Sequence, residues 1–136
     1  MKNKIKVVVK RPQEKAFVAE IDKGLASLQN FVDGLIECVE MPRVKNVDII
    51  LNEEGKLLGL PFNFFLPEYR DVVAGTAVIA GFNPRSGNHI SLTDEQIEQA
   101  QRYLEHTSVR SNSEVFLAVQ LGFDKIGRFN DSDLEM

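Results

Sequence analysis

An aromatic ring, two amides, a guanidinium and an imidazole lie close together in the segment 82–89. The side chains there that suit ligand binding are those of Phe82, Asn83, Arg85 and His89. The segment precedes a helix expected to start at Asp94, where free backbone N–H groups and the helix dipole favour an anion. Phe82 has a ring that can stack on a base, and Arg85 has the planar donor set that holds a phosphate. An ordinary polar loop with Phe82 anchored in the core is the other interpretation of the same residues.

Three basic side chains then recur every four residues, at Arg102, His106 and Arg110. If the helix runs that far they share one face, which either contacts solvent or lies against Arg85 of a second subunit. Asn63 sits in an aromatic segment between two prolines, where its amide bonds either local backbone or the edge of a ligand. Together with the segment 82–89, these residues form the predicted binding site for a small anionic ligand.

No arrangement of residues matches a known catalytic or metal-binding motif. Glu53 and Glu54 are adjacent on an expected turn, where carboxylates point apart into water instead of sharing an acid/base pocket. Cys38 is the only cysteine, and the spacing of His89 and His106 relative to it and to the acidic residues matches no zinc motif. A Gly-x-Ser-x-Gly elbow and a phosphate-binding glycine loop are also absent. We therefore expect no enzyme, no metal and no cofactor.

Composition narrows the class of protein. The chain has 136 residues, of which 43% are apolar, enough for one domain with a core. Sixteen basic residues against twenty acidic ones give a net charge of −4, which argues against general nucleic-acid binding. A single cysteine excludes an internal disulfide, and no apolar run approaches the length of a signal peptide or a membrane span. We expect a cytoplasmic protein that does not contact membranes.

Hydrophobic periodicity predicts the elements of the first half of the chain. Two strands joined by a turn are expected over 5–9 and 17–21, followed by a helix that starts at Leu25 and ends at Gly34. A strand over 35–41 is expected to pair with one over 47–51. The quartet 52–55, Asn-Glu-Glu-Gly, is typical of a turn and predicts a hairpin whose second strand is Lys56 to Leu60.

Two apolar segments follow this expected hairpin. The segment 61–67 holds three phenylalanines between two prolines and predicts a buried or interface-forming loop with a short helical turn. The run 71–81 is almost continuously apolar, which favours one central strand covered on both faces. Gly75 within it indicates a bulge or a close approach of two backbones.

The last third of the chain contains helix signals. Thr93 and Gln96 have the spacing of a capping box for a helix from Asp94 to about Glu105. Residues 114–121 fit equally well a second helix ended by Gly122 or a buried strand. From residue 130 onward we expect a frayed terminus.

Three runs taken together resemble a known family. They are 25–29 with 32–37, then 52–63, then 71–78, and their order and spacing are similar to small bacterial and phage proteins grouped as domain of unknown function 3846. The resemblance covers residues 5–99, so the segment after Arg102 lies outside it. It implies a small α+β domain that is frequent in phages and mobile elements. Because the family has no established chemistry, the resemblance identifies no catalytic residues.

The sequence thus predicts an α+β fold with a mostly antiparallel sheet, a short helix after the first hairpin and one or two C-terminal helices. We expect one domain over 1–136, with a sheet-rich core over 1–92 and a helical C-terminal extension over 93–130. The predicted function is non-catalytic binding of a small anionic or nucleotide-like ligand by a homo-oligomer. A phage-encoded protein of this kind would sequester a nucleotide-type immune signal in the host cytoplasm. The alternative is an inhibitor that binds a host enzyme through an apolar patch of Phe62, Phe64 and Phe65.

Overall fold

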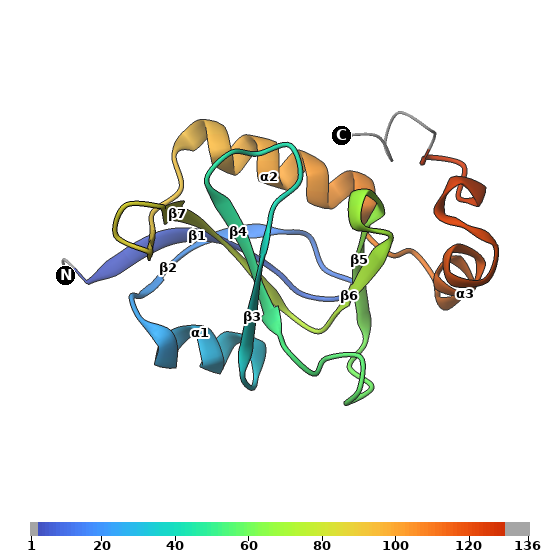
Figure 1. The fold of residues 1–136 in the computed structure, drawn as a ribbon, viewed down its shortest axis with the longest axis horizontal. Coiled ribbons are helices and arrows are strands. Elements are labelled where there is room, and N and C mark those ends of the chain that lie inside the picture. Colours follow the sequence, from blue (N-terminus) through green and yellow to red (C-terminus); the bar gives the residue numbers. More distant parts are fainter. Residues whose placement is uncertain (1–2, 130–136) are drawn as a thin grey trace.

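The computed structural model describes residues 3–129, so the predicted fraying from residue 130 lies outside the described part of the chain. The strands come before the last two α-helices along the chain, and Figure 1 shows how these elements are arranged. The strands are β1 (Lys4–Lys10), β2 (Phe17–Asp22), β3 (Ile36–Glu40), β4 (Val47–Asn52), β5 (Phe62–Leu66), β6 (Asp71–Ala74), β7 (Ala77–Asn83) and β8 (Asn88–Ile90). The α-helices are α1 (Leu25–Val32), α2 (Asp94–Thr107) and α3 (Asn112–Leu121), and short 3-10 helices span Pro67–Tyr69 and Phe123–Lys125.

The main sheet has the order β2-β1-β7-β4-β3, with β8 pairing the last residues of β7. Every neighbouring pair is antiparallel. The first hairpin and the pairing of β3 with β4 confirm the predictions from periodicity. The α+β fold class, the mostly antiparallel sheet and the C-terminal helices are confirmed as well.

Helices α1 and α2 cover opposite faces of this sheet, below and above it in Figure 1. Side chains of successive strand residues point to opposite faces, so each inner strand contributes to two cores. The core under α2 includes Val8, Ile49, Ile79, Ala100 and Leu104, and the core over α1 includes Val7, Leu28, Val32, Ile50 and Val78. Burial on both faces explains the unbroken apolar runs within β1 (7–9), β4 (49–51) and β7 (77–82).

The capping box predicted for α2 is present. The backbone N–H of Gln96 donates to the Thr93 hydroxyl at 3.1 Å, and the backbone N–H of Thr93 donates to the Gln96 side chain at 2.9 Å. Helix α2 then extends to Thr107, two residues past the predicted end. None of the helices in the described part of the chain is long and apolar enough to cross a membrane.

Strands β5 and β6 form a second, two-stranded sheet at one end of the main sheet. Phe64 points into the core under α2, whereas the next residue, Phe65, contributes to a third core with α3. The Phe65 ring meets the rings of Phe123 and Phe129 edge-on, at centroid distances of 5.8 and 5.6 Å. Of the two structures predicted for 114–121, a helix and a strand, the helix is therefore the one that forms. This helix, α3, packs on the outer side of β5.

The predicted strand from Lys56 to Leu60 is wrong, because residues 53–59 form successive turns. The hydrogen-bonding edges of β4 are already occupied by β3 and β7, so no ladder position is left for a third partner. The segment bonds to itself instead, with the Leu58 N–H donating to the Glu54 carbonyl and the Leu60 N–H to the Gly55 carbonyl.

Two further expectations are corrected in the apolar middle of the chain. The segment predicted as a loop contains strand β5, although the expected helical turn follows at Pro67–Tyr69. The run 71–81 is interrupted at Gly75, which has a φ of +87° and separates β6 in the small sheet from β7 in the main sheet. A Cβ at Gly75 would come within 2.8 Å of the Leu60 side chain, and the Gly75 N–H donates to the Pro61 carbonyl at 2.8 Å, so the position is closely packed.

The aromatic patch on which the alternative function depended is not on the surface. Phe64 and Phe65 are each 0% exposed, and Phe62 is only partly exposed. Their rings are instead part of the two cores that join β5 to α2 and α3.

Candidate functional site

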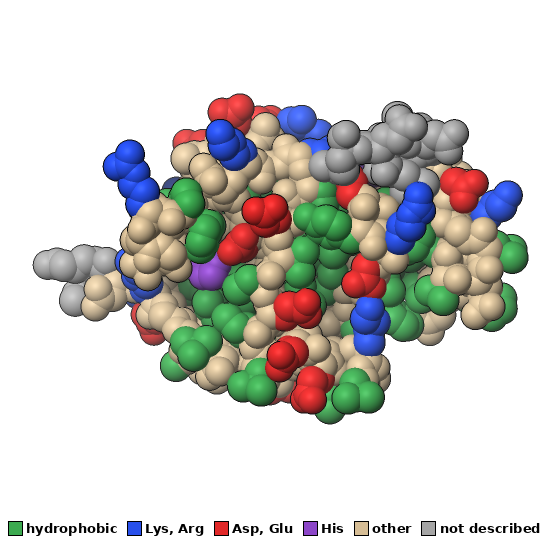
Figure 2. All heavy atoms as spheres, in the orientation of Figure 1, with side chains coloured by type: hydrophobic (Ala, Val, Ile, Leu, Met, Phe, Trp, Pro, Cys, Tyr) green, Lys and Arg blue, Asp and Glu red, His purple; other side chains and the backbone are tan. Residues whose placement is uncertain are grey.

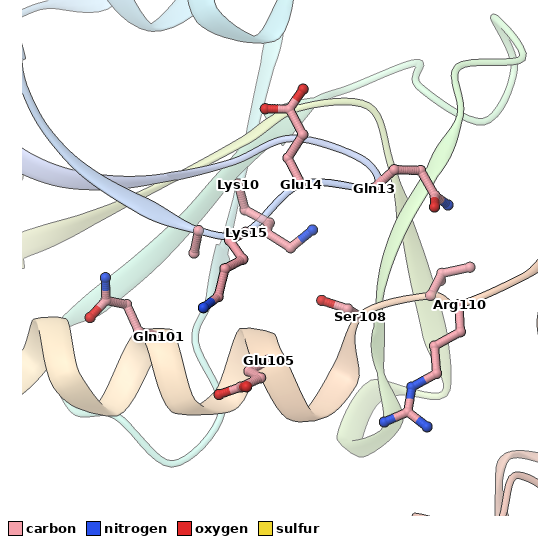
Figure 3. Close-up of a pocket in the computed structure, with 10 residues that line it drawn as sticks. Lys10, Gln13, Glu14, Lys15, Gln101, Glu105, Ser108 and Arg110 are labelled. Carbon is pink, nitrogen blue, oxygen red and sulfur yellow. The ribbon is translucent and has the colours of Figure 1, made fainter.

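A cleft of about 710 Å³ opens between the β1–β2 turn and the C-terminal end of α2 (Figure 3). Its walls come from segments far apart in the sequence, and most of its lining side chains are polar or charged. They are Lys10, Gln13, Glu14, Lys15, Ala16, Gln101, Glu105, Ser108, Val109 and Arg110. Of the predicted ligand-binding residues, Arg110 alone lines this cleft.

Lys10 forms the buried side of the cleft. It is the last residue of β1 and is 2% exposed, with its ammonium donating to the Arg11 carbonyl and to the Asn63 side-chain oxygen, each at 2.9 Å. Both acceptors are neutral, and no carboxylate of residues 3–129 lies within ion-pair distance of the ammonium. Burial lowers the pKa of Lys10, and the Glu14 charge only partly opposes that shift.

Asn63 holds Lys10 in this position. Its amide nitrogen donates to the Lys10 carbonyl at 2.9 Å and to the Gly75 carbonyl at 2.8 Å, while its oxygen accepts from the Lys10 ammonium. The side chain is 0% exposed, so Asn63 does not reach the cleft itself. Asn63 and Lys10 are 53 residues apart, and the aromatic segment around Asn63 gave no indication that a lysine would be its partner.

Further charged groups lie around the cleft opening. Lys15 and Arg110 are exposed, and Figure 3 shows Lys15 extending toward α2. Glu105 faces the cleft from α2, whereas Glu14 points away from that helix. Positive side chains therefore outnumber the carboxylates directed at the space between the turn and the helix. Lys10 and Lys15 were missed at the sequence level, because both look like ordinary members of a solvated basic N-terminus.

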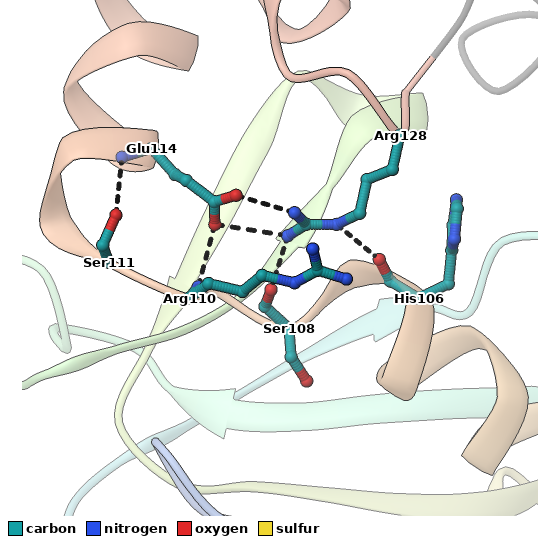
Figure 4. Close-up of polar contacts among 6 residues, drawn as sticks. All are labelled: His106, Ser108, Arg110, Ser111, Glu114 and Arg128. Carbon is teal, nitrogen blue, oxygen red and sulfur yellow. Dashed lines mark hydrogen bonds and ion pairs between the residues drawn. The ribbon is translucent and has the colours of Figure 1, made fainter.

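The far wall of the cleft, residues 108–110, is fixed by an ion-pair network (Figure 4). Arg128 donates to the Glu114 carboxylate at 2.7 and 3.3 Å and to the carbonyls of His106 and Ser108 at 2.8 and 2.6 Å. Glu114 also accepts from the Arg110 backbone N–H at 2.8 Å. The network ties the C-terminal segment to the α2–α3 connection and so sets the backbone from which Arg110 projects.

The basic row predicted along one helix does not form as a row. Helix α2 ends at Thr107, so Arg110 lies outside it, in the segment that connects α2 to α3. Arg102 pairs with Glu98 at 3.5 Å, and Arg102 and His106 line a separate hollow of about 430 Å³ with residues 42–44. The row is broken because α2 ends before Arg110. At this end of the helix the hydroxyls of Thr107 and Ser108 donate to backbone carbonyls one turn back.

The segment 82–89, predicted as a loop, is the hairpin between β7 and β8. The Asn83 side-chain oxygen accepts from the Arg85 backbone N–H at 2.9 Å, which closes the turn and leaves the Arg85 side chain exposed. The Phe82 and His89 rings lie side by side at 5.6 Å, and His89 bonds Asp48 at 2.8 Å. This hairpin precedes α2 and Arg110 follows it, so the length of a 14-residue helix, about 20 Å, lies between the hairpin and Arg110.

The one cysteine is not an activated nucleophile. Burial, together with the negative charges of Asp48 and Glu37, raises the pKa of the Cys38 thiol. A protonated thiol is a poor nucleophile, since the thiolate is the reactive form.

Residues 5–107 match the model of one protein family, described as Domain of unknown function (DUF3846). The chain belongs to this family. The match ends at the last residue of α2, so α3, Glu114 and Arg128 lie beyond the family region. No curated protein and no solved structure gives a match to the chain. Asn52 and Asn63 belong to the run 52–63 that carries the resemblance. Both are buried, and their side-chain amides donate to backbone carbonyls of neighbouring segments, which holds those segments together.

Proposed function

We propose that this protein binds a small anionic ligand, without converting it chemically, in the cleft between residues 13–16 and the end of α2. The observation that carries this proposal is the buried Lys10 ammonium, whose hydrogen-bond partners in the described chain are neutral. A buried charge without an opposite charge is costly, and proteins ordinarily pair it. An anion in the cleft would supply both the missing charge and a further hydrogen-bond acceptor.

The size and lining of the cleft support a ligand of nucleotide dimensions. Its volume of about 710 Å³ lies within the range of roughly 300–1,000 Å³ that is common for small-molecule sites. Lys15 and Arg110 would contact phosphate groups near the opening. The amides of Gln13 and Gln101 offer donors and acceptors to a base or sugar. Since no aromatic side chain of residues 3–129 lines the cleft, a base would be recognised by hydrogen bonds instead of stacking.

Binding without turnover would remove such a ligand from solution. We propose that the biological role is sequestration of a nucleotide-type immune signal by a phage or mobile-element protein. The resemblance to phage proteins supports that role.

Titration of the full chain with inorganic phosphate, pyrophosphate and a panel of linear and cyclic nucleotides tests the proposal. Binding would be followed by thermal shift and by calorimetry at low salt. A ligand at one hundred times its dissociation constant adds about 2.7 kcal/mol of stability, which a thermal shift readily detects. Intact ligand recovered after long incubation would confirm that no conversion occurs.

Lys10→Met is the decisive variant, because Met keeps most of the side-chain volume and removes the charge. Loss of a charged hydrogen bond of about 1.5–3 kcal/mol lowers affinity roughly 10- to 100-fold. Lys4→Met is the matched control on the same strand, since Lys4 pairs with Asp22 away from the cleft. Arg110→Gln, at an exposed position, provides a second test if Lys10→Met does not fold. Stabilisation by no member of the panel, or equal affinity in both cleft variants and the control, would overturn the proposal.

The pH dependence offers an independent check on the role of Lys10. Because burial lowers its pKa, the ammonium loses its proton at a lower pH than an exposed lysine does. Anion affinity should therefore fall as pH rises through that lowered pKa, and the fall should be absent in Lys10→Met.

A further inference from the structure

A thiol, a carboxylate and an imidazole lie close together on three strands of the main sheet. They belong to Cys38 on β3, Asp48 on β4 and His89 on β8. The ligand atoms of the three side chains all lie within 4.8 Å of one another. They form the one group of this kind among residues 3–129 that is close enough to hold a metal ion.

The sheet register places these side chains on one face. Asp48 is opposite Glu40 on β3, and Cys38 is opposite Ile50, so Cys38 and Asp48 are diagonal neighbours on adjacent strands. On the other side of β4, Asp48 is opposite Ala80 of β7, and His89 pairs with Phe82 two residues further along that strand. All three donors therefore project from paired strands, which hold side chains more firmly than loops do.

The surroundings favour a cation. The side chains of Asp48 and His89 are 12% and 18% exposed, and Nε2 of His89 lies 2.8 Å from a carboxylate oxygen of Asp48. Glu37 and Glu40 add negative charge along β3, and Figure 2 shows acidic side chains gathered on this side of the molecule with a histidine beside them. Cys38 is exposed, so an ion bound there would keep contact with solvent.

We propose that Cys38, Asp48 and His89 bind one borderline-soft divalent cation such as Zn²⁺, with solvent at the remaining coordination position. Sulfur, nitrogen and oxygen donors together suit Zn²⁺, whereas Mg²⁺ and Ca²⁺ take oxygen donors almost exclusively. Three protein ligands and one solvent molecule are the arrangement of an open zinc site.

Only a small adjustment is needed for coordination. Bond lengths of about 2.0–2.3 Å in a tetrahedral site place donor atoms roughly 3.3–3.6 Å apart. The widest separation of up to 4.8 Å must therefore shorten by about 1 Å, which rotation of the exposed Cys38 side chain can supply, and the 2.8 Å contact between Nε2 of His89 and Asp48 must lengthen by about 0.5 Å. No sequence motif marks this site, because its donors come from three separate strands.

Cobalt titration of the reduced full chain tests the proposal directly. Cobalt bound to a thiolate has an intense charge-transfer absorption, and Cys38 is the only cysteine, so any such band reports on this site. We expect one ion per chain, displacement of Co²⁺ by Zn²⁺, and loss of the band in Cys38→Ser. Calorimetry with Zn²⁺ should show at least a roughly 10-fold weaker affinity in that variant, since even loss of an outer-shell partner has such an effect.

His106→Gln is the matched control, because His106 lies on α2 and outside the donor group. His89→Gln should weaken binding, with circular dichroism confirming that the variant is folded. Absence of a cobalt–thiolate band in the full chain would overturn the proposal. A Zn²⁺ affinity that is the same in Cys38→Ser as in the unchanged chain would also overturn it, and would leave Asp48 and His89 as a hydrogen-bonded pair.

Discussion

Arg128 joins the C-terminal segment to the wall of the cleft, and Arg128→Met measures how firmly that wall is held. The change keeps most of the aliphatic stem and removes the guanidinium. It eliminates two hydrogen bonds to Glu114 and one each to the carbonyls of His106 and Ser108. Glu114 keeps its bond from the Arg110 backbone N–H, so its carboxylate is not left without a donor.

The expected cost is about 2–4 kcal/mol at neutral pH. Each hydrogen bond to a charged group contributes about 1.5–3 kcal/mol, and breaking a fully buried ion pair costs about 3–5 kcal/mol. The Arg128 and Glu114 side chains are 13% and 19% exposed, so water can replace part of what is lost. The expected cost is therefore shifted below the range for a fully buried pair.

The same contacts predict a dependence on pH. Burial by itself would raise the pKa of Glu114, but the hydrogen bonds from Arg128 and from the Arg110 backbone, together with both charges, lower it below its ordinary value of 4.5. A carboxyl whose pKa is lower in the folded state stabilises the fold above its unfolded pKa. That contribution disappears as pH falls through the folded pKa, so acidification should narrow the stability gap between Arg128→Met and the unchanged chain.

Chemical denaturation followed by circular dichroism measures both effects, since the chain has no tryptophan. Arg102→Met is the control, because Arg102 is 71% exposed and its pairing with Glu98 should contribute no more than about 1 kcal/mol. A loss no larger than that of Arg102→Met at neutral pH would refute the energetic reasoning. A gap that stays constant on acidification would refute the part assigned to Glu114.

Two further changes test the contacts that β5 and α2 make with neighbouring segments. Phe65→Ala should cost about 3–5 kcal/mol, because the side chain is 0% exposed and meets two other phenylalanine rings; Phe116→Ala, at a position 67% exposed, should change stability by about 0.5 kcal/mol or less. Equal denaturation midpoints for these two variants would contradict the third core. Tyr103→Phe should cost about 1–3 kcal/mol, because its hydroxyl donates at 2.6 Å to Glu68, whose side chain is 2% exposed. A midpoint unchanged by Tyr103→Phe would show that water replaces this bond.

Features set by neighbouring residues were predictable. The capping box of Thr93 and Gln96 depends on two side chains three positions apart, and its bonds form as expected. The first hairpin and α1 follow from the period of their apolar residues. Residues 114–121 were ambiguous because their apolar run is nearly unbroken. They form a helix whose buried side chains pack in one core with Phe65.

Features that depend on which segments meet were not predictable in the same way. Lys56 to Leu60 has the composition of a strand, yet both edges of β4 are taken by other partners. Arg102 and Arg110 have helical spacing, yet α2 ends between them. Asn63 was identified as a candidate for ligand contact, whereas the structure buries it behind Lys10, a residue with no distinguishing local pattern.

The sequence by itself determined the family, through the order and spacing of three runs. It also determined the α+β class and most of the elements, because periodicity and side-chain capping act over a few residues. Only the tertiary structure decided where chemistry is possible. It placed the Lys10 ammonium beside neutral partners at a cleft, and it brought Cys38, Asp48 and His89 from three strands to within 4.8 Å. The reason is physical: burial and charge pairing depend on contacts between distant segments, and a local pattern does not specify those contacts.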